Sequence, residues 1–137
     1  QMTSYYREDI ATLPEVEAYG QKLFKMAGIT PREIDVAQFY DAFSPLVPMQ
    51  LEALGFIPKG EGVPYCEGGH RIRRDGELPI NTAGGLMSEG YLHGMNLITE
   101  GVRQVRGTST TQIENQEYVL VTGGLGVPSS GLILRRR

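Results

Sequence analysis

Two apolar runs near the carboxyl end limit the possible folds of this chain more than any other feature. Residues 118–122 (YVLVT) and 132–134 (LIL) have almost no polar side chains, which is typical of strands that are covered on both faces. A stretch rich in Gly, Pro and Ser joins them, so an antiparallel pair is the simplest arrangement. Because a sheet with two apolar faces needs helices against both, these runs predict a layered α/β fold.

Upstream of these strands, the chain contains two helical patterns. Residues 12–15 (TLPE) match a capping box, and apolar residues then recur at helical spacing until Gly28. Residues 44–45 (SP) predict the start of a short helix over about residues 47–54, with Pro48 in its first turn because a deeper proline would remove a helical hydrogen bond.

A third helix is predicted over residues 91–106. Apolar residues fall on one of its faces, namely Met95, Ile98, Val102 and Val105. Gly94 and Gly101 each weaken a helix by roughly 1 kcal/mol relative to alanine. We therefore expect a neighbouring element to approach this helix closely.

Extended segments complete the predicted sheet. Residues 35–40 alternate apolar and polar with a period of two, residues 78–82 form a short strand candidate, and residues 30–33 favour a single helical turn. The expected result is a mixed β-sheet flanked by helices, in one domain over residues 1–137. Glycine, proline and charge dominate residues 58–76, which are predicted to form a long protruding loop.

Composition narrows the classes of function. The 137 residues are 40% hydrophobic and 21% charged, as in ordinary globular domains. The net charge of −3 and the lack of a basic stripe argue against nucleic acid, and we expect the terminal residues 135–137 (RRR) to be a solvated tail. No apolar run reaches the roughly 20 residues of a membrane span. One cysteine (Cys66) and two scattered histidines predict no metal site and a reducing, cytoplasmic setting.

Three segments, in this order, resemble the thiolase superfamily. Residues 40–43 (YDAF) resemble the Asn-Glu-Ala-Phe loop of thiolases. Residues 81–94 (NTAGGLMSEGYLHG) are similar to the family segment Asn-x-x-Gly-Gly-x-x-x-x-Gly-His-Pro-x-Gly, and residues 122–126 (TGGLG) stand where the family has a Cys-x-Gly-Gly-Gly-x-Gly loop. The resemblance implies a thiolase-like layered fold, of which this chain is the carboxyl-terminal half.

The catalytic positions of thiolases carry other residues here. The thiolase asparagine falls on Tyr40, the histidine falls on Tyr91, and the cysteine falls near residues 120–122. Thiolase chemistry needs a histidine and a cysteine with suitable pKa values, so condensation or thiolysis is not expected. The pattern most closely resembles the lipid-transfer-protein-like aldolases of bacterial steroid side-chain degradation, which are related to the thiolase-like part of sterol carrier protein X.

This closer resemblance implies a reaction and a set of partners. The family performs retro-aldol cleavage of a β-hydroxyacyl-CoA, releasing a 17-ketosteroid and propionyl-CoA, with the CoA thioester as substrate and no separate cofactor. It works as a thiolase-like homodimer with an OB-fold, zinc-ribbon partner protein. An amino-terminal half, absent from this chain, would carry most of the CoA site.

Two tyrosines are the predicted catalytic residues. Tyrosine has an unperturbed pKa of about 10, too high for an efficient base at neutral pH, so a site would have to lower it. Tyr91 is the preferred proton-transfer residue, because it is predicted to follow Gly90 at the start of a helix, where backbone amides favour a phenolate. Tyr40 is predicted to hydrogen-bond the substrate hydroxyl or to share a proton with Tyr91. Which tyrosine is base and which is acid stays open.

Other residues are predicted to support these two. His93, two positions after Tyr91, would point away from that phenol on a helix and is a secondary candidate. Asp41 either orients Tyr40 or forms a turn or cap. Backbone amides at Gly84, Gly85, Gly123 and Gly124 are candidates for binding the thioester or enolate oxygen, although tight turns explain these glycines as well. The alternative function is a non-catalytic subunit that binds acyl-CoA or lipid, or acts as a scaffold.

Overall fold

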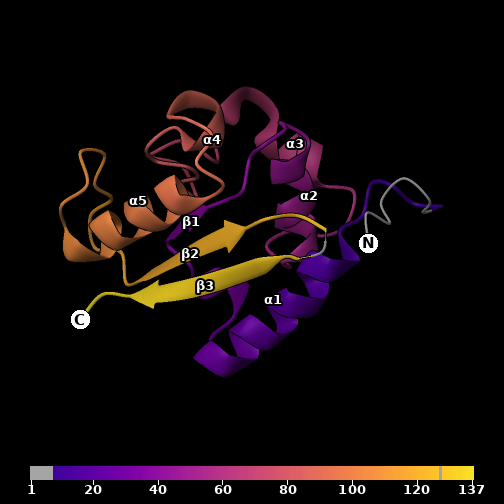
Figure 1. The fold of residues 1–137 in the computed structure, drawn as a ribbon, viewed down its shortest axis with the longest axis horizontal. Coiled ribbons are helices and arrows are strands. Elements are labelled where there is room, and N and C mark those ends of the chain that lie inside the picture. Colours follow the sequence, from indigo (N-terminus) through magenta and orange to yellow (C-terminus); the bar gives the residue numbers. More distant parts are fainter. Residues whose placement is uncertain (1–7, 127) are drawn as a thin grey trace.

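The computed structural model describes residues 8–126 and 128–137. One sheet of three strands, β1 (Val36–Gln38), β2 (Tyr118–Gly123) and β3 (Ser130–Arg135), forms in the order β1-β2-β3. β2 pairs parallel with β1 and antiparallel with β3, as Figure 1 shows. The predicted antiparallel pair and the mixed sheet are confirmed.

Helices cover both faces of this sheet. α1 (Pro14–Ala27) packs against β3 on one face, and α5 (Met95–Arg106) packs against β2 on the other (Figure 1). Alternate residues of β2 enter different cores, because successive strand side chains point to opposite faces. Leu120 packs with Phe24 of α1, whereas Val121 packs with Leu97 of α5. The predicted layered α/β fold is therefore confirmed.

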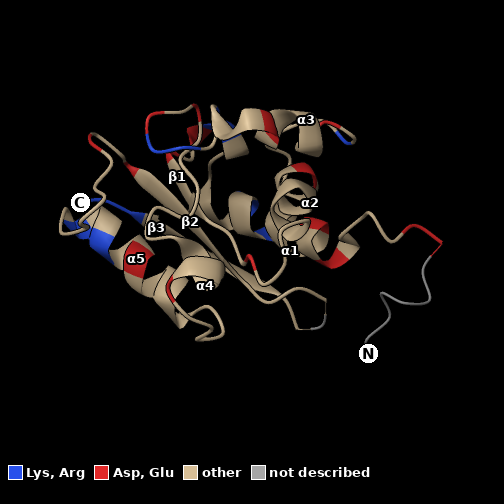
Figure 2. Ribbon diagram, turned by 90° about the horizontal axis from the view of Figure 1, so that it is seen from above, with Lys and Arg blue, Asp and Glu red and all other residues tan. Residues whose placement is uncertain are grey.

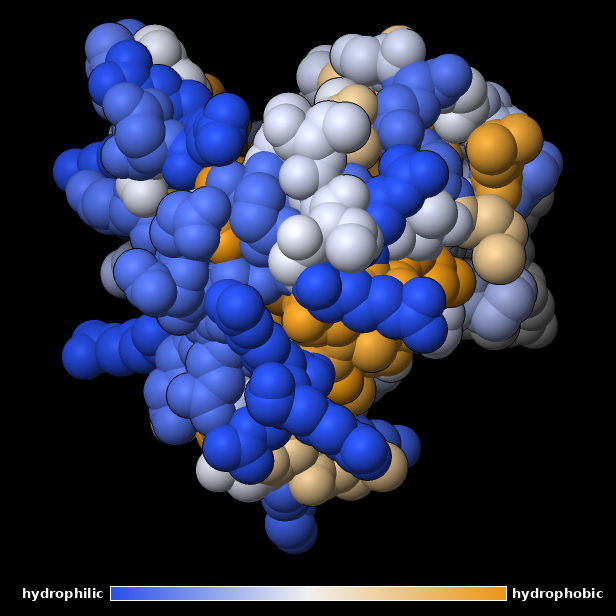
Figure 3. Space-filling view, turned by 90° about the vertical axis from the view of Figure 1, so that its left-hand side faces the viewer, coloured by the Kyte–Doolittle hydropathy of each residue, from blue (hydrophilic) through white to orange (hydrophobic). Residues whose placement is uncertain are grey.

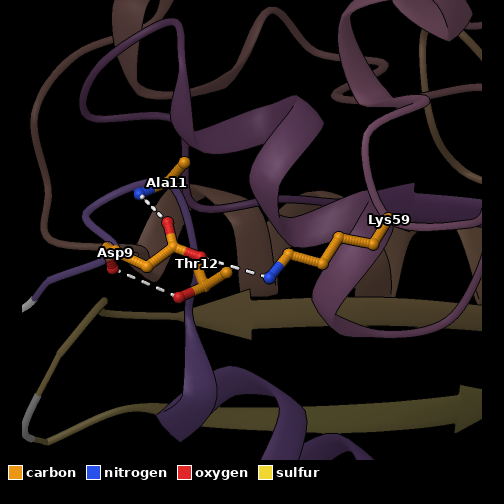
Figure 4. A network of polar contacts seen from close by, with 4 residues as sticks. All are labelled: Asp9, Ala11, Thr12 and Lys59. Atoms are coloured by element: carbon orange, nitrogen blue, oxygen red, sulfur yellow. Dashed lines mark hydrogen bonds and ion pairs between the residues drawn. The ribbon is translucent and has the colours of Figure 1, made fainter.

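The capping box predicted before α1 does not form. Leu13 occupies the N-cap, and the Thr12 hydroxyl donates instead to the backbone carbonyl of Asp9 at 3.3 Å. The Asp9 carboxylate accepts from the Ala11 backbone N–H at 3.0 Å and from the Lys59 ammonium at 3.2 Å, as Figure 4 shows. This network ties the segment before α1 to the loop that follows α2.

A capping box does form at the single turn predicted next. The 3-10 helix Pro31–Glu33 follows Thr30, whose backbone N–H donates to the Glu33 carboxylate at 2.7 Å. This reciprocal contact and the proline at the first helical position hold the turn that leads into β1.

α2 (Leu46–Ala53) begins one residue earlier than predicted, and Pro48 lies in its first turn as expected. Pro45 rather than Ser44 is its N-cap. The predicted loop over residues 58–76 is only partly irregular, because it contains α3 (Gly62–Cys66) and the 3-10 helix Glu67–Gly69.

Two predicted strands are shorter in the structure. Residues 78–82 contribute only an isolated bridge between Ile80 and Ala37. β1 ends at Gln38, because the next two residues bond side chains rather than a neighbouring strand. The Phe39 backbone bonds both amide atoms of Asn81, at 2.7 Å and 3.1 Å.

α5 begins at Met95 rather than at residue 91, and a short helix, α4 (Gly85–Ser88), precedes it. The buried face differs from the apolar face predicted for it. Met95 is 60% exposed, and the buried α5 residues are Asn96, Leu97, Glu100, Gly101 and Gln104. Polar side chains are buried here because they bond one another: the Gln104 amide donates to Glu100 at 2.9 Å, and the Thr82 hydroxyl donates to Glu100 at 2.6 Å.

The close approach predicted for this helix is confirmed at Gly101. A Cβ atom there would lie 2.6 Å from a methyl carbon of Val121 on β2. Gly94 lies outside the helix, as its N-cap residue.

Charge is unevenly distributed over the molecule. Figure 2 shows acidic residues along α1 and α2, and basic residues at the carboxyl end of α5 and the nearby chain end. Arg135 belongs to β3 and pairs with Glu117 at 2.8 Å, so the predicted solvated tail begins only after it. Figure 3 shows the side opposite the carboxyl ends of β1 and β2, where the surface is mostly hydrophilic around a band of hydrophobic atoms. In the described ranges, no helix is long and apolar enough to cross a membrane.

Candidate active site

The two predicted tyrosines meet in the structure. Tyr40 follows the end of β1 by two residues, and Tyr91 lies in the connection between α4 and α5. Their hydroxyl oxygens are 3.0 Å apart, so either phenol can donate a hydrogen bond to the other. Residues from two distant parts of the sequence therefore form one polar pair at the carboxyl end of the sheet.

The two phenols differ in exposure. Tyr40 is 9% exposed and Tyr91 is 54% exposed. Burial, the hydrogen bond with Tyr91 and the proximity of that phenol raise the pKa of Tyr40 to about 12. Tyr40 thus keeps its proton at neutral pH and can donate it in a hydrogen bond, and Tyr91 is the more exposed of the two side chains.

The sequence predicted Tyr91 at the start of a helix, and this placement is wrong. Tyr91 comes three residues after the end of α4 and four before the start of α5, so it does not lie on the first turn of a helix. Tyr91 lies instead in the connection between the two helices, where its hydroxyl contacts that of Tyr40.

His93 also differs from its prediction. Its φ of +50° places it in the left-handed region, so the helical spacing used to aim it away from Tyr91 does not apply. The rings of Tyr91 and His93 meet edge to face, with centroids 4.7 Å apart. His93 is therefore a direct neighbour of the exposed phenol.

Asp41 contacts the start of α4, 45 positions along the chain, rather than a local turn. Its carboxylate is buried and accepts a hydrogen bond from the backbone N–H of Leu86 at 2.8 Å. This contact fastens α4 to the end of β1. A Cβ atom at Gly85 would collide with the Asp41 carboxylate, so only glycine fits there, at a φ of +68°.

A cavity of about 440 Å³ lies at the end of β2, and neither Tyr40 nor Tyr91 is among the described residues that line it. Its lining includes His93, Gly94, Thr122, Gly123 and Gly124. Gly94 connects the two features, because a Cβ atom there would lie 3.6 Å from the ring of Tyr40 and 4.0 Å from Gly123.

The two predicted glycine pairs occupy different places. Gly123 and Gly124 line the cavity at the end of β2. Gly84 and Gly85 form the start of α4 and are not among the described residues of that lining. A second cavity of about 440 Å³ lies between α1 and α2, and it contains none of the predicted site residues.

Sequence reasoning missed two residues that bond the backbone of Tyr40. Thr122 accepts from the Tyr40 N–H at 2.8 Å, and Gln50 of α2 donates to the Tyr40 carbonyl at 2.9 Å. The Thr122 hydroxyl in turn donates to Gln50 at 2.6 Å. Each is a polar residue inside an apolar segment. This pattern could have identified them, because a buried polar group needs a hydrogen-bond partner.

No group of three or more His, Cys, Asp or Glu residues that could hold a metal ion occurs within residues 8–126 and 128–137. Cys66 ends α3, where burial raises the pKa of its thiol, and it lies outside the site. The polar groups at the candidate site are thus phenols, an imidazole, and backbone and side-chain amides.

Comparisons with known proteins place this arrangement in a family. The family model for thiolase C-terminal domain-like proteins matches residues 1–136. The chain is 50% identical over 133 residues to 17-hydroxy-3-oxo-4-pregnene-20-carboxyl-CoA lyase of Mycobacterium tuberculosis, covering 97% of this chain and 34% of that protein. It is also 50% identical to a steroid side-chain-cleaving aldolase of Thermomonospora curvata, with the same coverage.

A solved structure of a related aldolase has the same fold. The chain superimposes on the Ltp2-ChsH2(DUF35) aldolase with a TM-score of 0.91 and 48% identity, covering 96% of this chain and 34% of the other. The chain thus spans about a third of the length of these relatives. On the match to its family model and this identity to its relatives, the chain belongs to the thiolase C-terminal domain-like family.

Proposed function

We propose that the protein containing this chain cleaves a β-hydroxyacyl-CoA thioester by a retro-aldol reaction, with Tyr91 transferring the proton and Tyr40 donating a hydrogen bond to Tyr91. The observation that carries this proposal is the 3.0 Å contact between the two phenol oxygens. A nearby cavity is lined by His93, whose ring contacts that of Tyr91. The two relatives, a steroid carboxyl-CoA lyase and a steroid side-chain-cleaving aldolase, support the reaction class. We further propose a steroid side-chain CoA ester as substrate, with a 17-ketosteroid and propionyl-CoA as products.

The proposed steps balance without a redox partner. In the proposed step Tyr91 enters as its phenolate, and Tyr40 stays protonated and donates a hydrogen bond to the Tyr91 oxygen. The phenolate oxygen of Tyr91 accepts the proton of the substrate β-hydroxyl and becomes a neutral phenol. The bond between the α- and β-carbons breaks, the β-carbon becomes the ketone, and the electron pair forms the thioester enolate. The proton taken from the hydroxyl then passes to the α-carbon.

The enolate oxygen needs a stabilising donor in this scheme. The backbone at Gly123 and Gly124 lines the cavity and is the proposed source of amide donors. His93, in contact with the Tyr91 ring, is proposed to restrict the orientation of that ring. No separate cofactor enters the proposed reaction, because the CoA is part of the substrate.

The remaining two thirds of the relatives' length has a role in this proposal. We infer that this amino-terminal part completes the thiolase fold and supplies most of the CoA site, and that the protein acts as a homodimer with an OB-fold, zinc-ribbon partner. The structural relative, the Ltp2-ChsH2(DUF35) aldolase, supports a two-component assembly because it is named for both components. A cytoplasmic location remains a prediction from the sequence.

The test is propionyl-CoA release from a β-hydroxyacyl-CoA steroid by the full-length protein with its partner. Tyr91→Phe removes only the hydroxyl, and we expect kcat to fall about 10²- to 10⁴-fold, the usual contribution of a positioned acid or base. Tyr118→Phe, at the amino end of β2, is the matched control and should keep wild-type turnover.

Two outcomes would change the proposal. Unchanged turnover in Tyr91→Phe would remove Tyr91 from the proton transfer. Absence of turnover in the wild type, with acyl-CoA binding retained, would instead favour the non-catalytic acyl-CoA-binding or scaffolding subunit.

A further inference from the structure

We propose that Thr122 and Gln50 are positioning residues that fix the Tyr40 phenol against Tyr91. This inference rests on the proposed function of Tyr40. It comes from a closed ring of three hydrogen bonds. The Tyr40 backbone N–H donates to the Thr122 hydroxyl at 2.8 Å, and this hydroxyl donates to the side-chain oxygen of Gln50 at 2.6 Å. The side-chain amide nitrogen of Gln50 donates to the Tyr40 backbone carbonyl at 2.9 Å.

The ring replaces the strand ladder where β1 stops. β1 pairs with β2 only as far as Gln38 opposite Val121. Beyond this point the hydroxyl of Thr122, the next residue of β2, accepts a hydrogen bond from the backbone N–H of Tyr40. Tyr40 is therefore held by the sheet although it lies outside the strand.

The side chains that bond the Tyr40 backbone are buried. Thr122 is 1% exposed and Gln50 is 0% exposed, so water cannot replace a lost partner. Each polar atom of the Gln50 amide has a partner, because its nitrogen also donates to the Leu46 carbonyl at 3.0 Å. With both backbone groups of Tyr40 held, the direction of its ring toward Tyr91 is restricted.

A small error in this direction would matter for catalysis. A displacement of about 1 Å in a reacting group can cost about 10²-fold in rate. The phenol oxygen lies at the far end of the side chain, so a tilt of the backbone is amplified there. The ring also connects α2 to the sheet, and the experiment has to separate that structural role from positioning.

The experiment compares three threonine variants in the full-length protein. Thr122→Val keeps the shape but removes the hydroxyl, Thr122→Ser keeps the hydroxyl, and Thr111→Val is the control. Thr111 also donates a hydrogen bond, to the Thr82 carbonyl at 2.8 Å, but it lies beyond the carboxyl end of α5 and away from the phenols. Thr111→Val shows the effect of removing a hydroxyl hydrogen bond at a half-buried site outside the ring.

We expect Thr122→Val to lower kcat about 100-fold while KM stays within about threefold of wild type, the pattern for a group needed mainly in the transition state. Thr122→Ser and Thr111→Val should keep wild-type kcat. If Thr122→Val does not fold, Gln50→Met tests the same ring from α2, and the same separation of kcat from KM is expected.

Crystal structures of the variants give a readout that does not depend on turnover. The separation of the two phenol oxygens should exceed hydrogen-bond distance in Thr122→Val and stay near 3.0 Å in the other two variants. An unchanged separation together with wild-type kcat would overturn the inference. If the wild-type protein proves inactive on β-hydroxyacyl-CoA, the proposed reaction fails but the crystallographic comparison still decides whether Thr122 positions Tyr40.

Discussion

At the scale of single residues, the two phenols are chemically identical, and their surroundings make them different. Tyr40 is 9% exposed and packs near Gly94, whereas Tyr91 is 54% exposed. Burial disfavours the charged phenolate, so the proton stays on Tyr40 and its hydrogen bond to Tyr91 persists at neutral pH. This division explains how two tyrosines can have two roles.

The raised pKa of Tyr40 predicts a loss of stability in alkaline solution. Its pKa is about 12 in the folded protein and about 10 when unfolded, so the folded state binds more protons between these values. The contribution is complete below pH 10 and is lost as the pH rises toward 12, with a slope of up to about 1.4 kcal/mol per pH unit. Urea unfolding at several pH values should show a steeper decline for the wild type than for Tyr40→Phe. Parallel curves would contradict the buried, protonated phenol.

At the scale of elements, the packing of α5 against β2 depends on Gly101. Alanine is the better helix former by about 1 kcal/mol, but its Cβ would lie 2.6 Å from Val121. We expect Gly101→Ala to destabilise the protein by about 1–3 kcal/mol, because overpacking outweighs helix propensity. Thermal unfolding measures this change, with Thr99→Ala on the exposed face of α5 as control.

A second substitution checks the cause of that effect. In Gly101→Ala with Val121→Ala, the clashing methyl groups are gone, so the double variant should lose less stability than the sum of the single variants. An additive result would mean that the strain lies elsewhere in the helix.

At the scale of the whole molecule, local patterns predicted the layers, and tertiary contacts decided the details. The segments that form β2 and β3 are almost wholly apolar, which predicts buried strands. The sheet and its antiparallel pair could therefore be predicted from the sequence. The buried face of α5 could not, because Glu100 and Gln104 bond each other and also need partners from other segments.

The candidate site shows the same division. The positions of Tyr40 and Tyr91 were predictable from motif resemblance, and their contact at 3.0 Å depends on how the fold joins residues 51 positions apart. The direction of His93 depends on a left-handed backbone, which spacing does not reveal. The pairing of Thr122 with Gln50 joins residues 72 positions apart, so neither residue signals its partner.

Because the fold brings the two phenols together from separate layers, they should act as one unit. In a double-mutant cycle on kcat/KM with Tyr40→Phe, Tyr91→Phe and the double variant, we expect the double variant to lose about as much as Tyr91→Phe alone. Once Tyr91 cannot accept the proton, the hydrogen bond from Tyr40 has nothing to stabilise, so the effects are not additive. The pair Tyr40→Phe and Tyr118→Phe, whose side chains lie at opposite ends of the sheet, is the control and should be additive. Additive losses for Tyr40 and Tyr91 would mean that the two hydroxyls act in separate steps, and the proposed support of Tyr91 by the hydrogen bond from Tyr40 would have to be abandoned.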